Sequence, residues 1–358
     1  MRIFQNFGLS RTYAQRFAKL NVVSDFAGQR DILVDDRYGA SHLLAPVFSK
    51  EETFFFTSGD VEKMQRAWAK ENGLPEKTTL PEILIAQIEQ HKTEVFYNLD
   101  PGRYDGTFVR RLPQHVKRKI CWRAAPGKID FSGYDFITCS FPSMRKTYEE
   151  QGNRTVEFFP AHDPVLDGYA TNSNRDIDVL FFGGFSRHHM KRTGILEAVA
   201  KLSNQYKVVF HLDNSRFTRL AETPLGWFGP LAKHRRPSAI MKVAQAPVFG
   251  RAMYEQLGRA KIVINASIDM AGDDRGNMRC YEAMGGGAML LTDVGNYPHG
   301  MVDGETMSVF NYSDEAVSKI EYSLSLGLWQ KTASNGNRLV KSDYSKAIQF
   351  SNFCRIAN

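Results

Sequence analysis

The chain has 358 residues, of which 42% are hydrophobic and 24% charged, and these values are typical of a globular protein. The length predicts about two domains, because single hydrophobic cores stop growing near 250 to 300 residues. No stretch approaches the roughly 18 uninterrupted apolar residues of a membrane span, and the first residues lack the apolar core of a signal peptide, so we expect a cytoplasmic protein.

Cysteine content and charge limit the classes further. The four cysteines lie far apart without a CxxC pair, so we expect neither a disulfide framework nor a zinc site. The net charge of +7 and the pI near 9.1 favour a polyanionic partner. Nucleic acid, an anionic membrane surface and a phosphate-bearing small molecule all fit, and the sign of the charge does not choose among them.

In the first half of the chain, a regular alternation of strands and helices is visible only near the end. Before residue 134 the clear elements are few: strands at 1–5, 94–97 and 119–122, and helices at 61–71 and 81–91. From Tyr134 onward the alternation is regular: a strand at 134–140, a helix at 142–152 and a strand at 155–160. Alternating strands and helices predict an α/β fold with mainly parallel sheets.

Residues 161–176 contain Pro, Gly, Asn, Ser and Asp without periodicity, which predicts a domain boundary. After it the alternation restarts, with the following elements: strands at 178–184, 207–212, 261–267 and 288–293, and helices at 189–204, 250–260, 314–326 and 335–353. A long, basic, Pro-containing insertion between Leu212 and Gly250 has no assignable structure. We therefore expect Rossmann-like doubly wound domains at 1–165 and 166–335, and a C-terminal helix at 336–358 that packs back on the first domain.

The segment "DVLFFGGFSRHHMKR" places Gly183 and Gly184 at the end of a predicted strand. Glycines at that point let a ligand approach the backbone, and the next helix offers unpaired N–H groups. The hydroxyl and cationic side chains that follow would neutralise a diphosphate; they are Ser186, Arg187, Lys191 and Arg192. The alternative is a tight turn followed by a solvated helix face. No GxxxxGK[ST] motif occurs, which disfavours nucleoside triphosphate hydrolysis.

The segment "DRGNMRCYEAMGGGAMLLTD", residues 274–293, predicts a helix that begins near Asn277. Arg279 and Glu282 are three residues apart and share a helix face. The carboxylate would accept two ribose hydroxyl hydrogens, and Arg279 would pair with phosphate. A surface Arg–Glu pair is the alternative, although it leaves the three glycines at 285–287 unexplained.

Other polar groups carry less information. Each of His115, His162, His188 and His189 would titrate near neutrality, and each is also an ordinary surface or structural residue. The basic clusters at 110–119 and 233–236 fit a solvated face, an anionic acceptor or nucleic acid. They lack the interleaved aromatic side chains of a stacking platform, so nucleic acid is disfavoured.

Taken with "VFGRAMYEQLGRAKIVINAS" (248–267), these segments resemble the GT-B glycosyltransferases, in particular the spore-maturation-protein-like group related to the retaining glycosyltransferase group 1 family. The resemblance covers roughly residues 134–330 and implies two Rossmann-like domains that face a cleft. In the related family two glutamates are separated by seven residues. The second binds the nucleotide ribose, and the first lies near the sugar or its phosphate. Glu282 matches the second, and Asp274 stands eight residues earlier in place of the first. Phe185 occupies the position of the family's usual cation, so Arg187, Lys191 or Arg192 would supply the phosphate contact.

The resemblance implies a metal-independent enzyme without a bound cofactor, for which a UDP- or GDP-sugar is the donor and retention is favoured over inversion. Expected catalytic residues are Arg279, Arg192, Lys191, Asp274 and Asp100. Expected donor-binding residues are Gly8, Gly183, Gly184, Ser186, Arg187, Asn277, Met278, Arg279, Glu282 and Gly286. Asp100 would serve as the base if the enzyme inverts, and Gly8 permits close approach at a strand end.

The expected acceptor is a hydroxyl of a glycan, a lipid-linked molecule or a protein in bacterial surface polysaccharide or glycoconjugate synthesis. Peripheral contact with the anionic inner face of the membrane is a further expectation. Two rivals remain open. One is a nucleotide-sugar 2-epimerase, which shares the fold, and the other is a non-catalytic module that binds nucleotides or polyanions.

Overall fold

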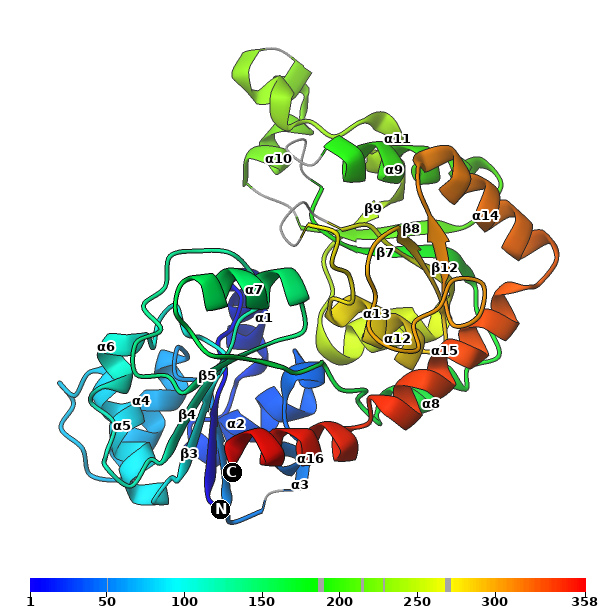
Figure 1. Ribbon diagram of the computed structural model, residues 1–358. Coiled ribbons are helices and arrows are strands. Elements are labelled where there is room, and N and C mark those ends of the chain that lie inside the picture. The colour runs from blue at the N-terminus through cyan, green and yellow to red at the C-terminus, as the bar shows by residue number, and fades with distance from the viewer. Residues whose placement is uncertain (50, 186–189, 214–215, 228, 268–271) are drawn as a thin grey trace. The chain divides into compact units, whose positions relative to one another are not determined.

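A computed structural model describes residues 1–49, 51–185, 190–213, 216–227, 229–267 and 272–358. The chain forms two compact units. The N-terminal unit comprises residues 1–161 together with 346–358, and the C-terminal unit comprises residues 162–345. Figure 1 shows the elements of both units by label. Among the described residues, no helix is long and apolar enough to span a membrane.

The N-terminal unit is built on a six-stranded parallel sheet with the order β2-β1-β3-β4-β5-β6. Its strands are β1 (Ile3–Asn6), β2 (Phe54–Thr57), β3 (Val95–Asn98), β4 (Arg118–Trp122), β5 (Phe136–Cys139) and β6 (Thr155–Glu157). β1 and β3 are buried along their whole length, as expected of parallel strands that are covered on both faces. The chain reverses its direction across the sheet between β1 and β3, which makes this pair the switch point of a doubly wound fold.

Helices cover both faces of this sheet. They are α1 (Arg11–Leu20), α2 (Phe26–Asp35), η1 (Ala40–His42), α3 (Pro46–Ser49), α4 (Glu62–Glu71), α5 (Leu80–His91), α6 (Gly106–Val109), α7 (Pro142–Glu150) and α16 (Lys346–Ala357). Successive strand residues point to opposite faces. Phe96 therefore packs with residues of α5 and α6 such as Leu84 and Phe108, whereas Tyr97 packs with Phe353 of α16.

The C-terminal unit contains a second six-stranded parallel sheet with the order β12-β11-β10-β7-β8-β9. Its strands are β7 (Ile177–Gly183), β8 (Val208–Leu212), β9 (Ala244–Gln245), β10 (Ala260–Asn265), β11 (Met289–Asp293) and β12 (Ser308–Phe310). Read from β9, the chain order is 3-2-1-4-5-6, which is the Rossmann order with its switch point between β7 and β10. The expected α/β class with two doubly wound sheets is thus confirmed.

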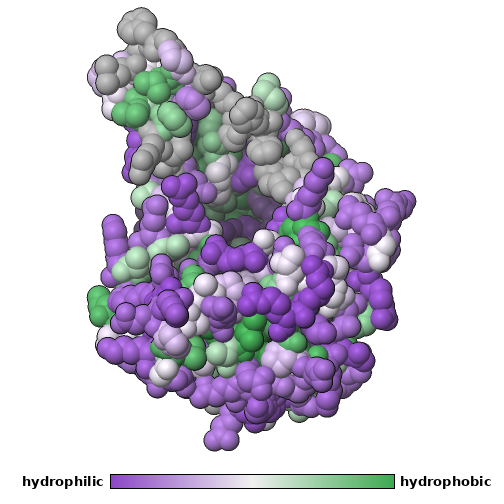
Figure 2. Space-filling model, turned by 90° about the vertical axis from the view of Figure 1, so that its left-hand side faces the viewer, coloured by the Kyte–Doolittle hydropathy of each residue, from purple (hydrophilic) through white to green (hydrophobic). Residues whose placement is uncertain are grey.

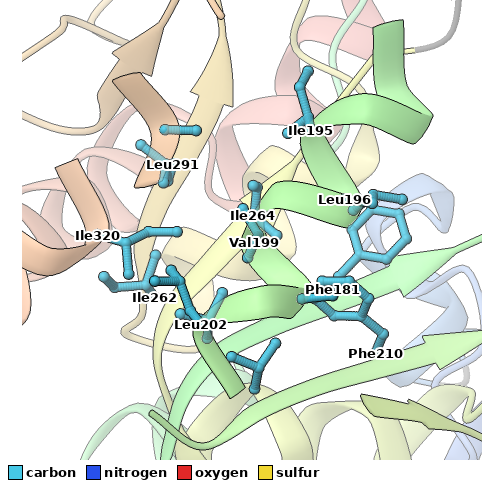
Figure 3. Packing of buried hydrophobic residues seen from close by; sticks show 14 of the residues in the cluster. Phe181, Ile195, Leu196, Val199, Leu202, Phe210, Ile262, Ile264, Leu291 and Ile320 are labelled. Atoms are coloured by element: carbon cyan, nitrogen blue, oxygen red, sulfur yellow. The ribbon is translucent and has the colours of Figure 1, made fainter. Parts of the chain in front are cut away.

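The helices of this unit are α8 (Leu166–Ala170), α9 (Met190–Lys201), η2 (Leu202–Asn204), α10 (Arg216–Ala221), η3 (Pro224–Trp227), η4 (Gly229–His234), α11 (Ser238–Val243), α12 (Gly250–Arg259), α13 (Met278–Gly285), α14 (Ser313–Ser325) and α15 (Trp329–Asp343). α9, α11 and α14 contribute to one core with alternate strand residues. Figure 3 shows Phe181 and Phe210 meeting in this core, with ring centroids 5.5 Å apart, beside Leu196 of α9. α12 and α13 lie against the opposite face of the sheet.

The end of the chain differs from the single C-terminal helix expected at 336–358. The structure has two helices, α15 in the C-terminal unit and α16 in the N-terminal unit. The break falls at Tyr344, whose backbone carbonyl accepts a hydrogen bond from the N–H of His162 at 2.7 Å. That carbonyl therefore does not continue the helical ladder. Within the N-terminal unit, the buried Lys346 ammonium donates to the carbonyls of Ala40 and Leu43 and anchors α16.

The first boundary also lies earlier than the expected division after residue 165. Ala161 donates its N–H to the carbonyl of Ser41 at 2.7 Å and belongs to the N-terminal unit. His162 forms an isolated parallel bridge with Ser345 and belongs to the C-terminal unit. The sequence before residue 161 does not show that the neighbouring residues Ala161 and His162 bond within different units.

Candidate functional site

The carboxyl edge of the C-terminal sheet gathers the polar groups that the sequence singles out. β7 ends at Gly183 and β10 ends at Asn265, and these two strands form the switch point. In open α/β sheets, ligands bind outside the carboxyl ends of the strands at this position. The helices that follow the strands direct their N-termini toward the same edge.

α13 begins at this edge. Asn277 is its N-cap, and the side-chain oxygen of Asn277 accepts the N–H of Arg279 at 3.1 Å. Met278 is the first helical residue. The remaining N–H groups and the positive end of the helix dipole favour an anion. Asn277 and Met278, both expected as donor-binding residues, thus lie at the start of the helix.

Arg279 and Glu282 form an ion pair of 2.7 Å on the first turns of α13. The Glu282 side chain is only 4% exposed and that of Arg279 19%. The Arg279 guanidinium also lies over the ring of Phe182, 4.7 Å from its centroid. A pair this buried is not the solvated surface pair of the alternative interpretation, because both charges have lost most of their water.

Burial raises the pKa of Glu282 above that of an ordinary glutamate; Arg279 opposes the rise, and the nearby carboxylate of Asp163 adds to it. Asp163 is itself buried and accepts a hydrogen bond of 3.0 Å from the hydroxyl of Tyr254 on α12. No motif in the sequence indicates this second carboxylate. Asp163 lies in the boundary segment, and its proximity to Glu282 arises only from the tertiary fold.

Arg192 approaches the end of β7 from α9. Its guanidinium lies 5.0 Å from the centroid of Phe181, and a Cβ added at Gly183 would overlap its Nη2 atom. Among the described residues, none accepts a hydrogen bond from the buried Nε of Arg192. Burial lowers the pKa of Arg192 to about 10, while Asp293 and Asp213 favour its charged form. The group therefore remains a cation at neutral pH.

The two guanidinium groups flank the end of β7 from opposite sides. Phe181 and Phe182 are consecutive strand residues and point to opposite faces of the sheet. Arg192 lies over the first ring and Arg279 over the second. The charge of Arg279 also lowers the pKa of Arg192, which indicates that the two cations lie close enough to interact. An anion at the strand end would therefore face cations from both faces.

The remaining residues expected after β7 divide into three cases. Gly183 has a positive φ of 153°, and of the described residues other than its chain neighbours none comes within 4 Å of a Cβ placed at Gly184. Lys191 is exposed next to Arg192. Ser186 and Arg187, together with His188 and His189, lie outside the described residues.

Asp274 is buried in the loop before α13 and forms an isolated bridge with Asn296. The following residue, Arg275, makes an ion pair of 3.0 Å with Asp293 at the end of β11, and both side chains are buried. Asp293 also accepts the N–H and hydroxyl of Ser267 at 2.9 and 2.5 Å. This network fixes the loops after β10 and β11, and sequence reasoning missed it because the partners come from separate strand ends.

The three glycines lie at the other end of α13 and have packing roles. A Cβ at Gly285 would lie 2.7 Å from Nδ1 of His162, and one at Gly286 would lie 2.8 Å from Cβ of Leu257. Gly287 has a φ of +72°. Gly286 follows the eight residues of α13, which place it about 12 Å along the axis from the start of the helix. Gly286 was expected to bind the donor. The structure explains the glycine at this position differently, because the lack of a side chain permits α13 to pack against Leu257.

Arg175 lies beside these glycines and is buried. Its Nη1 donates to the carbonyls of Leu257 and Ala260, at 3.1 and 2.6 Å. Its Nη2 donates to the carbonyls of Ala170 and Gly286, at 3.0 and 2.9 Å. One side chain thus joins the last turns of α8, α12 and α13.

Gly8 and Asp100 lie in the N-terminal unit, directly after β1 and β3 at its own switch point. Arg103 pairs with Asp100 at 3.2 Å. Burial raises the pKa of Asp100; Arg103 opposes the rise, and Asp60 adds to it. Gly8 was expected among the donor-binding residues. In the structure, Gly8 lies in close contact with the side chain of Asp100.

Within the described ranges, no group of three or more His, Cys, Asp or Glu side chains is arranged to hold a metal ion.

The chain is similar to known proteins in sequence over part of its length and in fold over nearly all of it. Residues 192–354 match a family model described as "Glycosyl transferase-like". A search of curated proteins gives no match. Among solved structures, HepE of Anabaena in complex with UDP is similar, with a TM-score of 0.58 and 9% identity over 99% of each chain.

A glycosyltransferase of Rickettsia africae has a TM-score of 0.53 and 11% identity, over 99% of this chain and 97% of that one. Sucrose-phosphate synthase of Thermosynechococcus elongatus has a TM-score of 0.52 and 12% identity, over 86% and 83%. The structural likeness shows that the chain has the GT-B fold of two Rossmann-like domains. The family match concerns residues 192–354 alone, which are similar in sequence to glycosyl transferases.

Proposed function

We propose that the protein transfers a sugar from a nucleoside diphosphate sugar to a hydroxyl group of an acceptor. The observation that carries the proposal is the pair of guanidinium groups, Arg192 and Arg279, on the two sides of the end of β7. With the N-terminus of α13 they form a cationic site at a Rossmann switch point. A diphosphate is the anion that such a site fits.

The proposed roles rest on the positions of these side chains and, for Asp274, on the sequence resemblance. Glu282 accepts the ribose hydroxyl hydrogens, and Arg279 and Arg192 bind the diphosphate, with Lys191 as an additional cation. Cleavage of the sugar–phosphate bond builds negative charge on the leaving diphosphate. Two fixed cations and a helix N-terminus stabilise that charge more strongly in the transition state than in the bound donor. Asp274 is the acidic residue proposed near the sugar or its phosphate.

The identity of the donor is part of the proposal. HepE, whose fold this chain shares, is known in complexes with UDP and with UDP and glucose. We infer a UDP-sugar as the donor, with a GDP-sugar as the alternative, and no metal or other cofactor. We also propose retention of the anomeric configuration and membership of the spore-maturation-protein-like group, on the basis of the sequence resemblance.

The acceptor is proposed to be a hydroxyl of a glycan, a lipid-linked molecule or a protein in bacterial surface polysaccharide or glycoconjugate synthesis. An enzyme that receives its nucleotide sugar from the cytoplasm would act there, with peripheral contact at the anionic inner face of the membrane.

Calorimetry with UDP and GDP tests the site directly. We expect the protein to bind one of them, and we expect Arg279→Ala and Glu282→Ala to weaken binding at least tenfold while the fold is kept, because each loses a charge-assisted contact. Lys92→Ala is the control, since it breaks the exposed Lys92–Glu89 pair of the same i,i+3 spacing on another helix. Binding like that of the unmodified protein by both site variants would refute the proposal.

Product analysis separates the two rivals. An epimerase would convert a nucleotide sugar without any acceptor, whereas a transferase needs the acceptor for sugar to leave the nucleotide in stoichiometric amount. A polyanion-binding module would bind DNA in a strongly salt-dependent manner and show no affinity for UDP or GDP.

A further inference from the structure

The basic insertion, residues 213–249, concentrates the charge of the protein. It holds six Lys and Arg residues against two Asp and Glu, a net charge of +4, whereas the whole chain carries +7. It follows β8, and Figure 1 shows α10 and the neighbouring short helices projecting beyond α9 and α11. More than half of the net charge therefore lies on about a tenth of the sequence.

The insertion has its own compact structure. Arg236 pairs with Glu222 through two hydrogen bonds, one of them from Nη2 at 2.8 Å, and both side chains are largely buried. Arg235 donates to the carbonyls of Ala221 and Thr223 at 2.7 and 3.1 Å. α10 and η3 pack so closely that a Cβ at Gly226 would overlap the Ala221 carbonyl. The Glu222 charge is thus neutralised inside the insertion.

Two large apolar side chains of α10 are largely exposed, although the Phe217 ring also stacks on that of His234 with centroids 5.3 Å apart. Phe217 is 59% exposed and Leu220 48%, and they are three residues apart on α10, so they share a face. Arg219 is exposed on the same helix. Figure 2 shows hydrophobic and hydrophilic residues side by side on this projecting part of the surface.

We propose that α10 of the basic insertion binds an anionic phospholipid surface, with Phe217 and Leu220 in the acyl boundary and Arg219 among the headgroups. The combination of exposed apolar side chains with adjacent cations is the pattern of interfacial helices. A soluble polyanion would use the cations and would leave Phe217 and Leu220 in water. The inference assigns the membrane contact of the proposed function to a defined surface, and in that respect it rests on the proposed function.

Vesicle co-sedimentation of the full chain tests the proposal. We expect binding to vesicles of phosphatidylcholine with about 30% phosphatidylglycerol, and little binding to phosphatidylcholine alone. Arg219→Glu should weaken partitioning about tenfold, because it replaces a headgroup-binding cation with an anion. The double variant Phe217→Ser, Leu220→Ser should also weaken it about tenfold, through the lost apolar burial.

Matched controls lie on other helices of the same unit. Tyr322→Ser removes an equally exposed apolar side chain, and Lys331→Glu reverses an exposed charge; both should bind vesicles within twofold of the unmodified protein. Unchanged vesicle binding in both α10 variants would overturn the proposal. So would a protein that binds heparin as well as anionic vesicles and is insensitive to the apolar double variant, because that result indicates a soluble polyanion.

Thermal shift with UDP and GDP, measured on the same samples, keeps the two proposals apart. Loss of vesicle binding with an intact nucleotide shift implicates α10 alone. Vesicle binding without any nucleotide shift supports the role of α10 and counts against the proposed donor site.

Discussion

Gly8 and Asp100 touch across the switch point of the N-terminal sheet, although 92 positions separate them in the chain. A Cβ added at Gly8 would lie 2.8 Å from the Cβ, the Cγ and one carboxylate oxygen of Asp100. Gly8 does not have a positive φ. The glycine is therefore required by this close approach and not by its backbone conformation.

Gly8→Ala should displace the Asp100 carboxylate and lower the free energy of unfolding by about 1 to 3 kcal/mol, as overpacking does. Denaturant unfolding measures the stability, and calorimetry with UDP measures the donor affinity. Unchanged affinity would indicate that Gly8 serves only its contact with Asp100. Weaker affinity would support the donor-binding role that the sequence suggests. An alanine variant with full stability would contradict the contact.

The role of Asp100 depends on the anomeric outcome. For the retention that we propose, Asp100→Asn should keep the transfer rate within about tenfold. Inversion would require a base, and the same variant would then lose about a hundredfold or more. Nuclear magnetic resonance of the product identifies the anomer, and kcat is measured in parallel. Full activity of Asp100→Asn would remove the residue from the mechanism in either case.

The pH profile gives a second test of Asp100. Burial raises its pKa, and a base acts only in its deprotonated form. If Asp100 is the base, activity should fall at a pH above the range of an ordinary aspartate, and this acid limb should disappear in Asp100→Asn. An acid limb that persists in the variant belongs to another group.

Phosphate and ribose contacts can be separated by ligand choice. Arg192→Ala should weaken UDP binding about tenfold to a hundredfold and leave uridine binding unchanged, because a lost charge-assisted bond affects only the phosphates. Glu282→Gln should weaken both ligands. Lys201→Ala is the matched control, because it removes an exposed cation at the other end of α9. Equal losses for UDP and uridine in Arg192→Ala would contradict its assignment to the diphosphate.

Asp163 is expected to act as a positioning residue for Glu282. Glu282 accepts ribose hydroxyl hydrogens most strongly when charged, so UDP affinity should fall as the pH drops through its raised pKa. Asp163→Asn removes a like charge and lowers that pKa, which shifts the fall to lower pH. Tyr254→Phe loses the hydrogen bond to Asp163 but keeps the charge, and its midpoint should stay. Calorimetry across pH measures both, and an unchanged midpoint in Asp163→Asn would contradict the coupling.

Gly286→Ala tests whether the triple glycine serves packing. The added methyl group meets Leu257 and should lower the free energy of unfolding by about 1 to 3 kcal/mol, while UDP affinity stays within twofold. Gly287→Ala should cost more, because its φ of +72° adds backbone strain. Intact stability with lost binding would restore Gly286 to the donor site.

Much of the fold could be predicted from the sequence because central parallel strands are buried on both faces and appear as continuous apolar runs. Predicted strands at 178–184 and 261–267 correspond to β7 and β10. The strands β9 and β12 have two and three residues, too few to show any period. β2, in contrast, has the run "FFFT", which would have permitted its prediction.

The candidate site was predictable only where its geometry is local. The i,i+3 spacing of Arg279 and Glu282 predicts a shared helix face, and the structure pairs them at 2.7 Å. Asp163 and Phe182 reach the same place from about 120 and 100 residues away, and their proximity depends on strand order. For Gly286 the sequence shows the residue type but not which end of the helix faces the ligand.

The hydrogen bonds of Arg175 hold the C-terminal end of α13 against its neighbours. The Arg175 guanidinium holds the carbonyl of Gly286 together with those of Leu257, Ala260 and Ala170. The eight residues of α13 span about 12 Å, so a rotation of about 5° at this end would move the opposite tip by about 1 Å. A displacement of that size at a reacting centre can cost about a hundredfold in rate. The positions of Arg279 and Glu282 therefore also depend on contacts at the opposite end of α13, about 12 Å away.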